Sequence, residues 1–127
     1  MSLLGYATVG TGDLARATAF YDALLEPLGA KRIHAFDRGV FYGAQGMEFC
    51  VLTPADGAEA QPGNGTMAAL NAATRALVDA THARALAMGG SDEGSPGIRG
   101  REASGFYGAY FRDPDGNKLC VYRIGPA

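Results

Sequence analysis

An internal repeat is the feature that most limits how this chain of 127 residues can fold. A shift of 61 positions aligns a strand-and-helix pattern in the first half with the same pattern in the second. The aligned pairs are Tyr6 with Met67, Asp13 with Thr74, Ala17 with Val78, Leu24 with Ala85 and Gly29 with Gly90. A shift of 70 aligns the segment GMEFCV with GNKLCV. We therefore interpret the chain as a duplicated unit of roughly 60 residues, and each half needs the other because so small a unit buries too little surface alone.

The first copy is predicted to contain one strand, one helix and three further strands. Asp13 offers a side-chain oxygen that would cap the helix, and apolar residues follow it at three- and four-residue spacing as far as Leu28. The later strands are separated by short segments with turn-forming residues, Asp-Arg-Gly at 37–39 and Gln-Gly at 45–46, which favour tight hairpins. The expected strands are 5–10, 31–36, 39–44 and 47–53.

The second copy repeats this order after a connector at about 55–64, which has no periodicity. Thr74 would cap a second helix that runs to Gly89 and Gly90. The expected strands are 65–70, a weak one near 90–93, then 106–112 and 118–124, with a chain break at 95–97. The fold class predicted is α+β, with βαβββ units at about 4–54 and about 65–125 in a single domain.

Composition excludes several classes of partner. The net charge of −2, from 11 basic and 13 acidic residues, offers no cationic surface for nucleic acid. No apolar run approaches the roughly 18 residues of a membrane span, and the first residues lack the pattern of a signal peptide. We therefore expect a cytoplasmic protein whose two cysteines stay as thiols.

Three segments together resemble the glyoxalase / bleomycin-resistance / dioxygenase superfamily, also called vicinal oxygen chelate. They are Thr11–Arg16 followed by Phe20 and Tyr21, then Val78–Ala80 leading to Gly89 and Gly90, and Arg112–Asn117. The resemblance covers almost the whole chain. It implies two paired βαβββ units that form a curved mixed sheet, a concave face that holds a small ligand, and a homodimer.

The resemblance also implies four positions for metal ligands, which family members fill with His, Gln or Glu around a divalent ion. Here these positions hold Tyr6, Met67, Cys50 and Cys120. Thioether and thiols suit Mn²⁺, Fe²⁺ or Mg²⁺ poorly, so we expect no metal and an apolar cavity lining instead. A soft site for Zn²⁺ or Cu(I), or one that uses Glu48, stays as an alternative.

The sequence also contains features of a cysteine nucleophile and of a dinucleotide-binding site, and its pattern favours neither. A cysteine nucleophile would need a base, and neither His34 nor His82 is placed in the cavity by its position. The glycines at 10 and 12 fit a dinucleotide-binding turn, with Asp37 as a ribose partner. The consecutive hairpin-like strands at 31–53 leave no crossover helix for such a fold.

Aromatic and cationic residues of the second copy give the remaining indication. Alternation places Phe106, Gly108 and Tyr110 on one face of their strand, and sequence does not decide whether that face or the other lines the cavity. Tyr122 should share a face with Cys120, and Arg99 could hold an anionic or carbonyl group, whereas Arg112 is interpreted as a hairpin-end charge.

The sequence therefore predicts a protein that binds a small organic molecule, without the usual catalytic divalent metal and without a cofactor. The candidate cavity residues are Tyr6, Cys50, Met67, Cys120, Tyr122 and Arg99. The alternative is a metal-dependent lyase, isomerase or dioxygenase with an atypical divalent or soft metal at the four positions.

Overall fold

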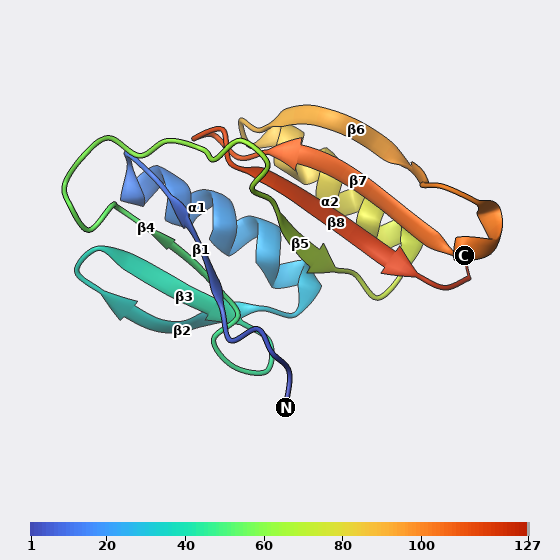
Figure 1. Ribbon diagram of the computed structural model, residues 1–127, viewed down its shortest axis with the longest axis horizontal. Helices are drawn as coiled ribbons and strands as arrows, with labels where there is room; N and C mark the ends of the chain where they lie inside the picture. The colour runs from blue at the N-terminus through green and yellow to red at the C-terminus, as the bar shows by residue number, and fades with distance from the viewer. Residues whose placement is uncertain (127) are drawn as a thin grey trace.

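The computed structural model describes residues 1–126 and contains the βαβββ order twice (Figure 1). The first copy consists of β1 (Ala7–Gly10), α1 (Leu14–Leu25), the short 3-10 helix η1 (Glu26–Leu28), β2 (Lys31–Phe36), β3 (Gly39–Gly43) and β4 (Phe49–Leu52). The second consists of β5 (Ala68–Asn71), α2 (Arg75–Ala87), β6 (Ser91–Ile98), the 3-10 helix η2 (Glu102–Ser104), β7 (Phe106–Arg112) and β8 (Lys118–Ile124). The predicted α+β fold class is confirmed.

Each copy forms its own four-stranded mixed sheet. The strand orders are β1-β4-β3-β2 and β5-β8-β7-β6, with β1 parallel to β4 and β5 parallel to β8. In the described residues the two units form two four-stranded mixed sheets, each with its own strand order. The chain after α1 runs through the antiparallel pair β2 and β3, which is incompatible with a dinucleotide-binding crossover.

The prediction was wrong for β6, which extends through the expected chain break at 95–97. This strand lies at the edge of its sheet, where a proline costs no ladder hydrogen bond, and its pairing with β7 shifts register twice. Strands β1 and β5 also begin later than expected, so that Tyr6 and Met67 stand immediately before them.

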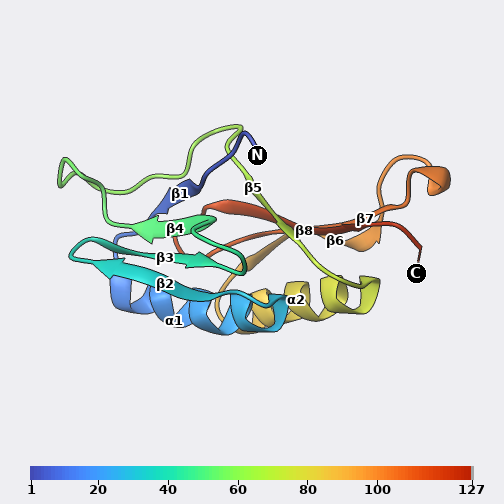
Figure 2. The ribbon, with the colours of Figure 1, turned by 90° about the horizontal axis from the view of Figure 1, so that it is seen from below.

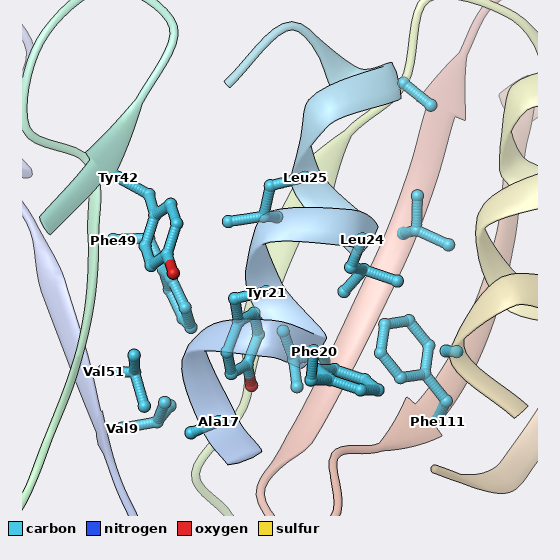
Figure 3. Packing of buried hydrophobic residues seen from close by; sticks show 14 of the residues in the cluster. Val9, Ala17, Phe20, Tyr21, Leu24, Leu25, Tyr42, Phe49, Val51 and Phe111 are labelled. Carbon is cyan, nitrogen blue, oxygen red and sulfur yellow. The ribbon is translucent and has the colours of Figure 1, made fainter. Parts of the chain in front are cut away.

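Helix α1 packs between the two copies (Figure 3). Tyr21 and Leu25 point toward Tyr42 and Phe49 of the first sheet, whereas Leu24 points toward Phe111 of the second. All six side chains are at most 5% exposed. Because one helix fills the space beside both sheets, the two small copies share one hydrophobic core.

Two of the three segments that carry the family resemblance, the first and the last, meet in a polar network that we call the clasp, formed by Arg16, Tyr21, Asp113, Asp115 and Asn117. The Tyr21 hydroxyl donates to Asp113 Oδ2 at 2.5 Å, and Arg16 pairs with Asp115 at 2.8 Å. The Asn117 amide donates to the main-chain carbonyl at the end of β1 at 2.8 Å. The β7–β8 turn of the second copy is therefore fastened to α1 and β1 of the first.

Both helices lie on one side of the two sheets, and the connector and the N-terminal segment lie on the other (Figure 2). The connector approaches the end of β1 closely, because a Cβ built on Gly10 would lie 3.2 Å from Cβ of Ala60. Among the described residues, no helix is long and apolar enough to cross a membrane.

Candidate functional site

The sheet face opposite the helices, here called the open face, carries the candidate site. Phe49, Val51, Leu119 and Val121 belong to the core beneath the helices. Side chains alternate along a strand, so Cys50, Cys120 and Tyr122 lie on the open face. The sequence left undecided which side-chain row of β7 faces the site. Ala109 and Phe111 are core residues, so the other row, Phe106, Gly108 and Tyr110, lies on the open face.

The open face of the first sheet is aromatic. Phe41 stands opposite Cys50 across the β3–β4 pair and opposite His34 across β2–β3. The ring of Tyr6 packs edge-on against Phe41 with 4.8 Å between centroids. The ring centroid of Phe36 lies 5.7 Å from that of Phe41. This half of the site offers flat apolar contact and one imidazole.

The open face of the second sheet combines aromatic rings with positive charge. Tyr110 stands opposite Cys120, and Phe106 stacks on Tyr122 with 5.1 Å between centroids and an interplanar angle of 4°. The Arg99 guanidinium carbon lies 5.3 Å from the Tyr110 ring centroid, and Lys118 Nζ lies 5.6 Å from it. The Tyr110 ring therefore carries two cations on the open face.

Two hollows lie beside the connector and the start of β8, and the smaller one also borders β1. The smaller has a volume of about 140 Å³ and is lined by all four residues of β1, by connector residues and by Met67, Ala68, Asn117 and Lys118. The larger has a volume of about 540 Å³ and is lined by residues 62–66, Met67, Arg112 and Lys118. Met67 and Lys118 contribute to the walls of both hollows.

The predicted cavity residues are divided between the sheets. Tyr6 and Cys50 belong to the open face of the first sheet, and Cys120 and Tyr122 to that of the second. Tyr6 and Met67 are 49% and 45% exposed, whereas Cys50 and Cys120 are buried. Arg99 lies in the loop directly after β6, and its amide donates to the carbonyl of Phe106 at 2.9 Å, so its backbone is fastened to the start of β7.

Neither thiol is activated as a nucleophile. Burial raises the pKa of Cys50, which the charge of Arg38 offsets only in part. Burial also raises the pKa of Cys120, against the opposing effects of a Tyr110 hydrogen bond and of Arg99 and Lys118. Both thiols therefore stay protonated near neutral pH.

Within residues 1–126, neither histidine forms a hydrogen bond with a thiol. His82 is buried on α2, and its Nε2 lies 2.9 Å from Asp92 Oδ1. The ring of His34 lies on the open face near Phe36 and Phe41. The position of His34 on this face was missed by the sequence pattern, which assigned neither histidine to the cavity.

The side chains at the four family positions do not fit a hard divalent ion. They are a phenol, a thioether and two protonated thiols, and none is the imidazole or carboxylate that such ions prefer. Glu48, the remaining candidate, uses Oε1 to accept a hydrogen bond from the amide of Ala44 at 2.7 Å. Within residues 1–126, no three His, Cys, Asp or Glu side chains gather as a metal site would require.

Sequence reasoning also missed Lys118 and the connector as parts of the site. Lys118 lies two residues before Cys120, so strand alternation alone could have placed it on the open face. The connector lacks any periodic signal, and only the folded chain shows that residues 62–66 wall the larger hollow. Arg112 forms an ion pair with Glu93 at 2.8 Å and donates to the carbonyl of Gly116 in the β7–β8 turn, as expected for a charge at a hairpin end.

Comparison with known proteins places this geometry in a family. The model of the Glyoxalase/Bleomycin resistance protein/Dioxygenase superfamily matches residues 3–121. A glyoxalase/bleomycin resistance protein from Albidiferax ferrireducens T118 is 38% identical, with a TM-score of 0.84 over 95% of this chain and 98% of that chain. A search of the curated proteins gives no match.

Two more distant structures share the fold. A glyoxalase/bleomycin resistance protein/dioxygenase family enzyme from Burkholderia phytofirmans PsJN is 18% identical, with a TM-score of 0.73 over 94% of this chain and 97% of that chain. The fosfomycin resistance protein FosX from Listeria monocytogenes is 22% identical, with a TM-score of 0.67 over 96% and 93% of the two chains. From the family match over nearly the whole sequence and the repeated βαβββ architecture, the chain belongs to the glyoxalase/bleomycin resistance protein/dioxygenase superfamily.

Proposed function

We propose that this protein binds a small organic molecule on its open face without a catalytic divalent metal. The observation that carries the proposal is the side-chain chemistry at the four family positions, where Tyr6, Cys50, Met67 and Cys120 replace hard metal ligands. Sites for organic molecules are lined mostly by apolar and aromatic groups with a few placed polar ones, and the open face has this composition.

Each candidate residue has a defined part in this proposal. Cys50 and Cys120 supply small apolar surface at the floor of each sheet, because buried protonated thiols behave as small hydrophobes. Tyr6, Met67 and Tyr122 supply flat or adaptable contact surface around them. Arg99 supplies the polar contact that orients the ligand.

We further propose that the protein acts as a homodimer in the cytoplasm. Tyr6 and Met67, which stand immediately before β1 and β5, are large apolar residues that are 49% and 45% exposed. Contact between two chains would cover these side chains and extend the open face. Light scattering coupled to size exclusion should give the mass of two chains, and a single-chain mass at micromolar concentration would reject the dimer.

The metal-free part of the proposal is tested by thermal unfolding. Mn²⁺, Fe²⁺, Ni²⁺ and Zn²⁺ should each leave the melting temperature unchanged, because a ligand stabilises a protein only when it binds the native state. A rise of several degrees that a chelator reverses would favour the metal-dependent lyase, isomerase or dioxygenase instead.

The binding part is tested with 2-naphthamide, a neutral aromatic probe, by isothermal titration calorimetry. Saturable binding of one probe per site is expected, and Cys120→Ala should change its affinity by only a few fold, since the substitution removes one small apolar contact. Absence of saturable binding to this probe and to its charged analogue would contradict a ligand site for aromatic molecules.

A further inference from the structure

The second half of the open face carries positive charge that no carboxylate neutralises. Within residues 1–126, the ion pairs of the protein use Arg16, Arg32, His82 and Arg112, and they leave Arg99 and Lys118 without an acidic partner. Both cations nevertheless lie over the same Tyr110 ring. Two cations held on one aromatic ring favour a ligand that brings its own negative charge.

Arg99 is held in place rather than extended into solvent. Its Nη2 donates to the carbonyl of Ser95 at 2.5 Å, and its guanidinium lies against the bare backbone of the irregular edge strand. A Cβ built on Gly94 or on Gly97 would lie 3.2 Å from a guanidinium nitrogen. The two glycines and the Tyr110 ring therefore form a cradle that holds the guanidinium in place, and only one of its N–H donors is used by the Ser95 carbonyl.

Lys118 connects this cradle to the hollows. It lines both the hollow of about 540 Å³ and the smaller one of about 140 Å³. The other cation on the larger hollow, Arg112, is already paired with Glu93 at 2.8 Å. Lys118 is thus the available positive charge on the wall of the larger space.

We infer that the ligand is an organic carboxylate, whose charged group lies between Arg99 and Lys118 above Tyr110 and whose apolar body lies along the open face. This inference rests on the proposed binding function and specifies the chemical class of its ligand. The planar fork of a guanidinium matches a carboxylate with two parallel hydrogen bonds, and a lysine adds a point charge. The stacked rings of Phe106 and Tyr122 supply an apolar surface that inorganic phosphate could not use.

The inference is tested with 2-naphthoate against 2-naphthamide, two probes that share a ring system and differ in charge. Calorimetry should show that the wild-type protein binds the carboxylate at least tenfold more tightly. Arg99→Met and Lys118→Met should each weaken the binding of 2-naphthoate by about tenfold, as expected for loss of one charge-assisted contact, and weaken the binding of 2-naphthamide less, so that the preference for the carboxylate falls. Arg101→Met and Lys31→Met, which remove exposed cations elsewhere, are the matched controls and should change neither affinity.

The possible results separate the inference from the proposed function. Equal affinity for the two probes would overturn the carboxylate inference and leave aromatic binding intact. Binding of neither probe would overturn both. Displacement of 2-naphthoate by inorganic phosphate at matched ionic strength would show that the site recognises any small anion, and loss of affinity in the control variants would show general charge attraction; either result rejects the inference.

Discussion

The two halves of the molecule agree on the side that faces the helices and differ on the open face. Phe49 and Val51 of β4 occupy the same register as Leu119 and Val121 of β8, and all four are at most 5% exposed. These positions pack against helices and neighbouring strands, where a polar or badly shaped side chain would be costly. Packing therefore explains why the two copies keep the same apolar pattern there.

On the open face, matched positions carry different chemistry. Glu48 corresponds to Lys118 and Leu52 to Tyr122 by the shift of 70. Phe41 corresponds to Tyr110, because each stands opposite the cysteine of its own sheet. The open face of the first half thus combines aromatic rings with one carboxylate, whereas that of the second combines aromatic rings with cations, and core packing does not require this difference.

The two copies differ most in the clasp, which joins the β7–β8 turn of the second copy to α1 of the first. Asp113 is 4% exposed and accepts four hydrogen bonds, from Tyr21, from the amide of Asp115 and from the amide and side chain of Asn117. Asp113→Ala should lower the free energy of unfolding by about 3–5 kcal/mol, measured by urea denaturation, because it leaves these donors unpaired. Asp56→Ala in the exposed connector is the control, and equal losses would reject the role of the clasp.

Removing a single hydroxyl of the clasp should have the next largest effect. Tyr21→Phe should cost about 1.5–3 kcal/mol at pH 7, since the lost hydrogen bond ends on a charged group. A loss of unfolding free energy below about 0.5 kcal/mol in urea denaturation would show that the Tyr21 hydroxyl contributes little and that the other hydrogen bonds to Asp113 maintain the clasp.

The same variant tests the pH dependence of stability. Burial, and then the charge of Asp113, raise the pKa of Tyr21 well above its usual 10.0. Below pH 10 the residue is protonated in both states and its contribution is complete; above pH 10 the unfolded chain loses this proton first, so stability falls as pH rises. The decline above pH 10 should be shallower in Tyr21→Phe by about 1.4 kcal/mol per pH unit. An unchanged slope in denaturation curves from pH 10 to about 11.5 would contradict the raised pKa.

Matched core positions should respond alike to the same truncation. Val51 and Val121 are both 0% exposed, and each Val→Ala substitution removes the equivalent of two buried methylene groups. Each should lower the unfolding free energy by about 1.5 kcal/mol, more where a cavity remains. A difference of more than about 1 kcal/mol between the two variants in urea titrations would show that the copies are not equally packed.

Matched open-face positions should matter least for stability. Glu48→Gln keeps an oxygen that can accept from Ala44, and it should change the unfolding free energy by no more than about 0.5 kcal/mol. Lys118→Gln loses only the contact with the Tyr110 ring, worth about 0.5–1 kcal/mol. A loss of 2 kcal/mol or more for Lys118→Gln would show that this lysine is part of the core architecture rather than of a ligand site.

The fold could be predicted because its signals are local and repeated. The two N-cap residues, Asp13 and Thr74, were recognised from sequence, and their side chains accept from Arg16 and Leu77 as caps should. The strand expected near 90–93 is present but extends to Ile98, and its length was missed because the pattern of Ser95, Pro96 and Gly97 indicates a turn locally. In the folded chain an edge position and pairing with β7 override that local preference.

The sequence by itself determined the duplication, the fold class and the unsuitability of Tyr6, Met67 and the two cysteines as hard-metal ligands, because periodicity, turn chemistry and donor type are properties of the residues themselves. Only the tertiary structure decided which row of β7 faces the site, that Arg99 and Lys118 both contact the Tyr110 ring, and that the motifs around Tyr21 and Asp113 fasten the two copies together. These are contacts between residues distant along the chain, and they depend on how α1 and the connector pack against both sheets, which no local pattern specifies.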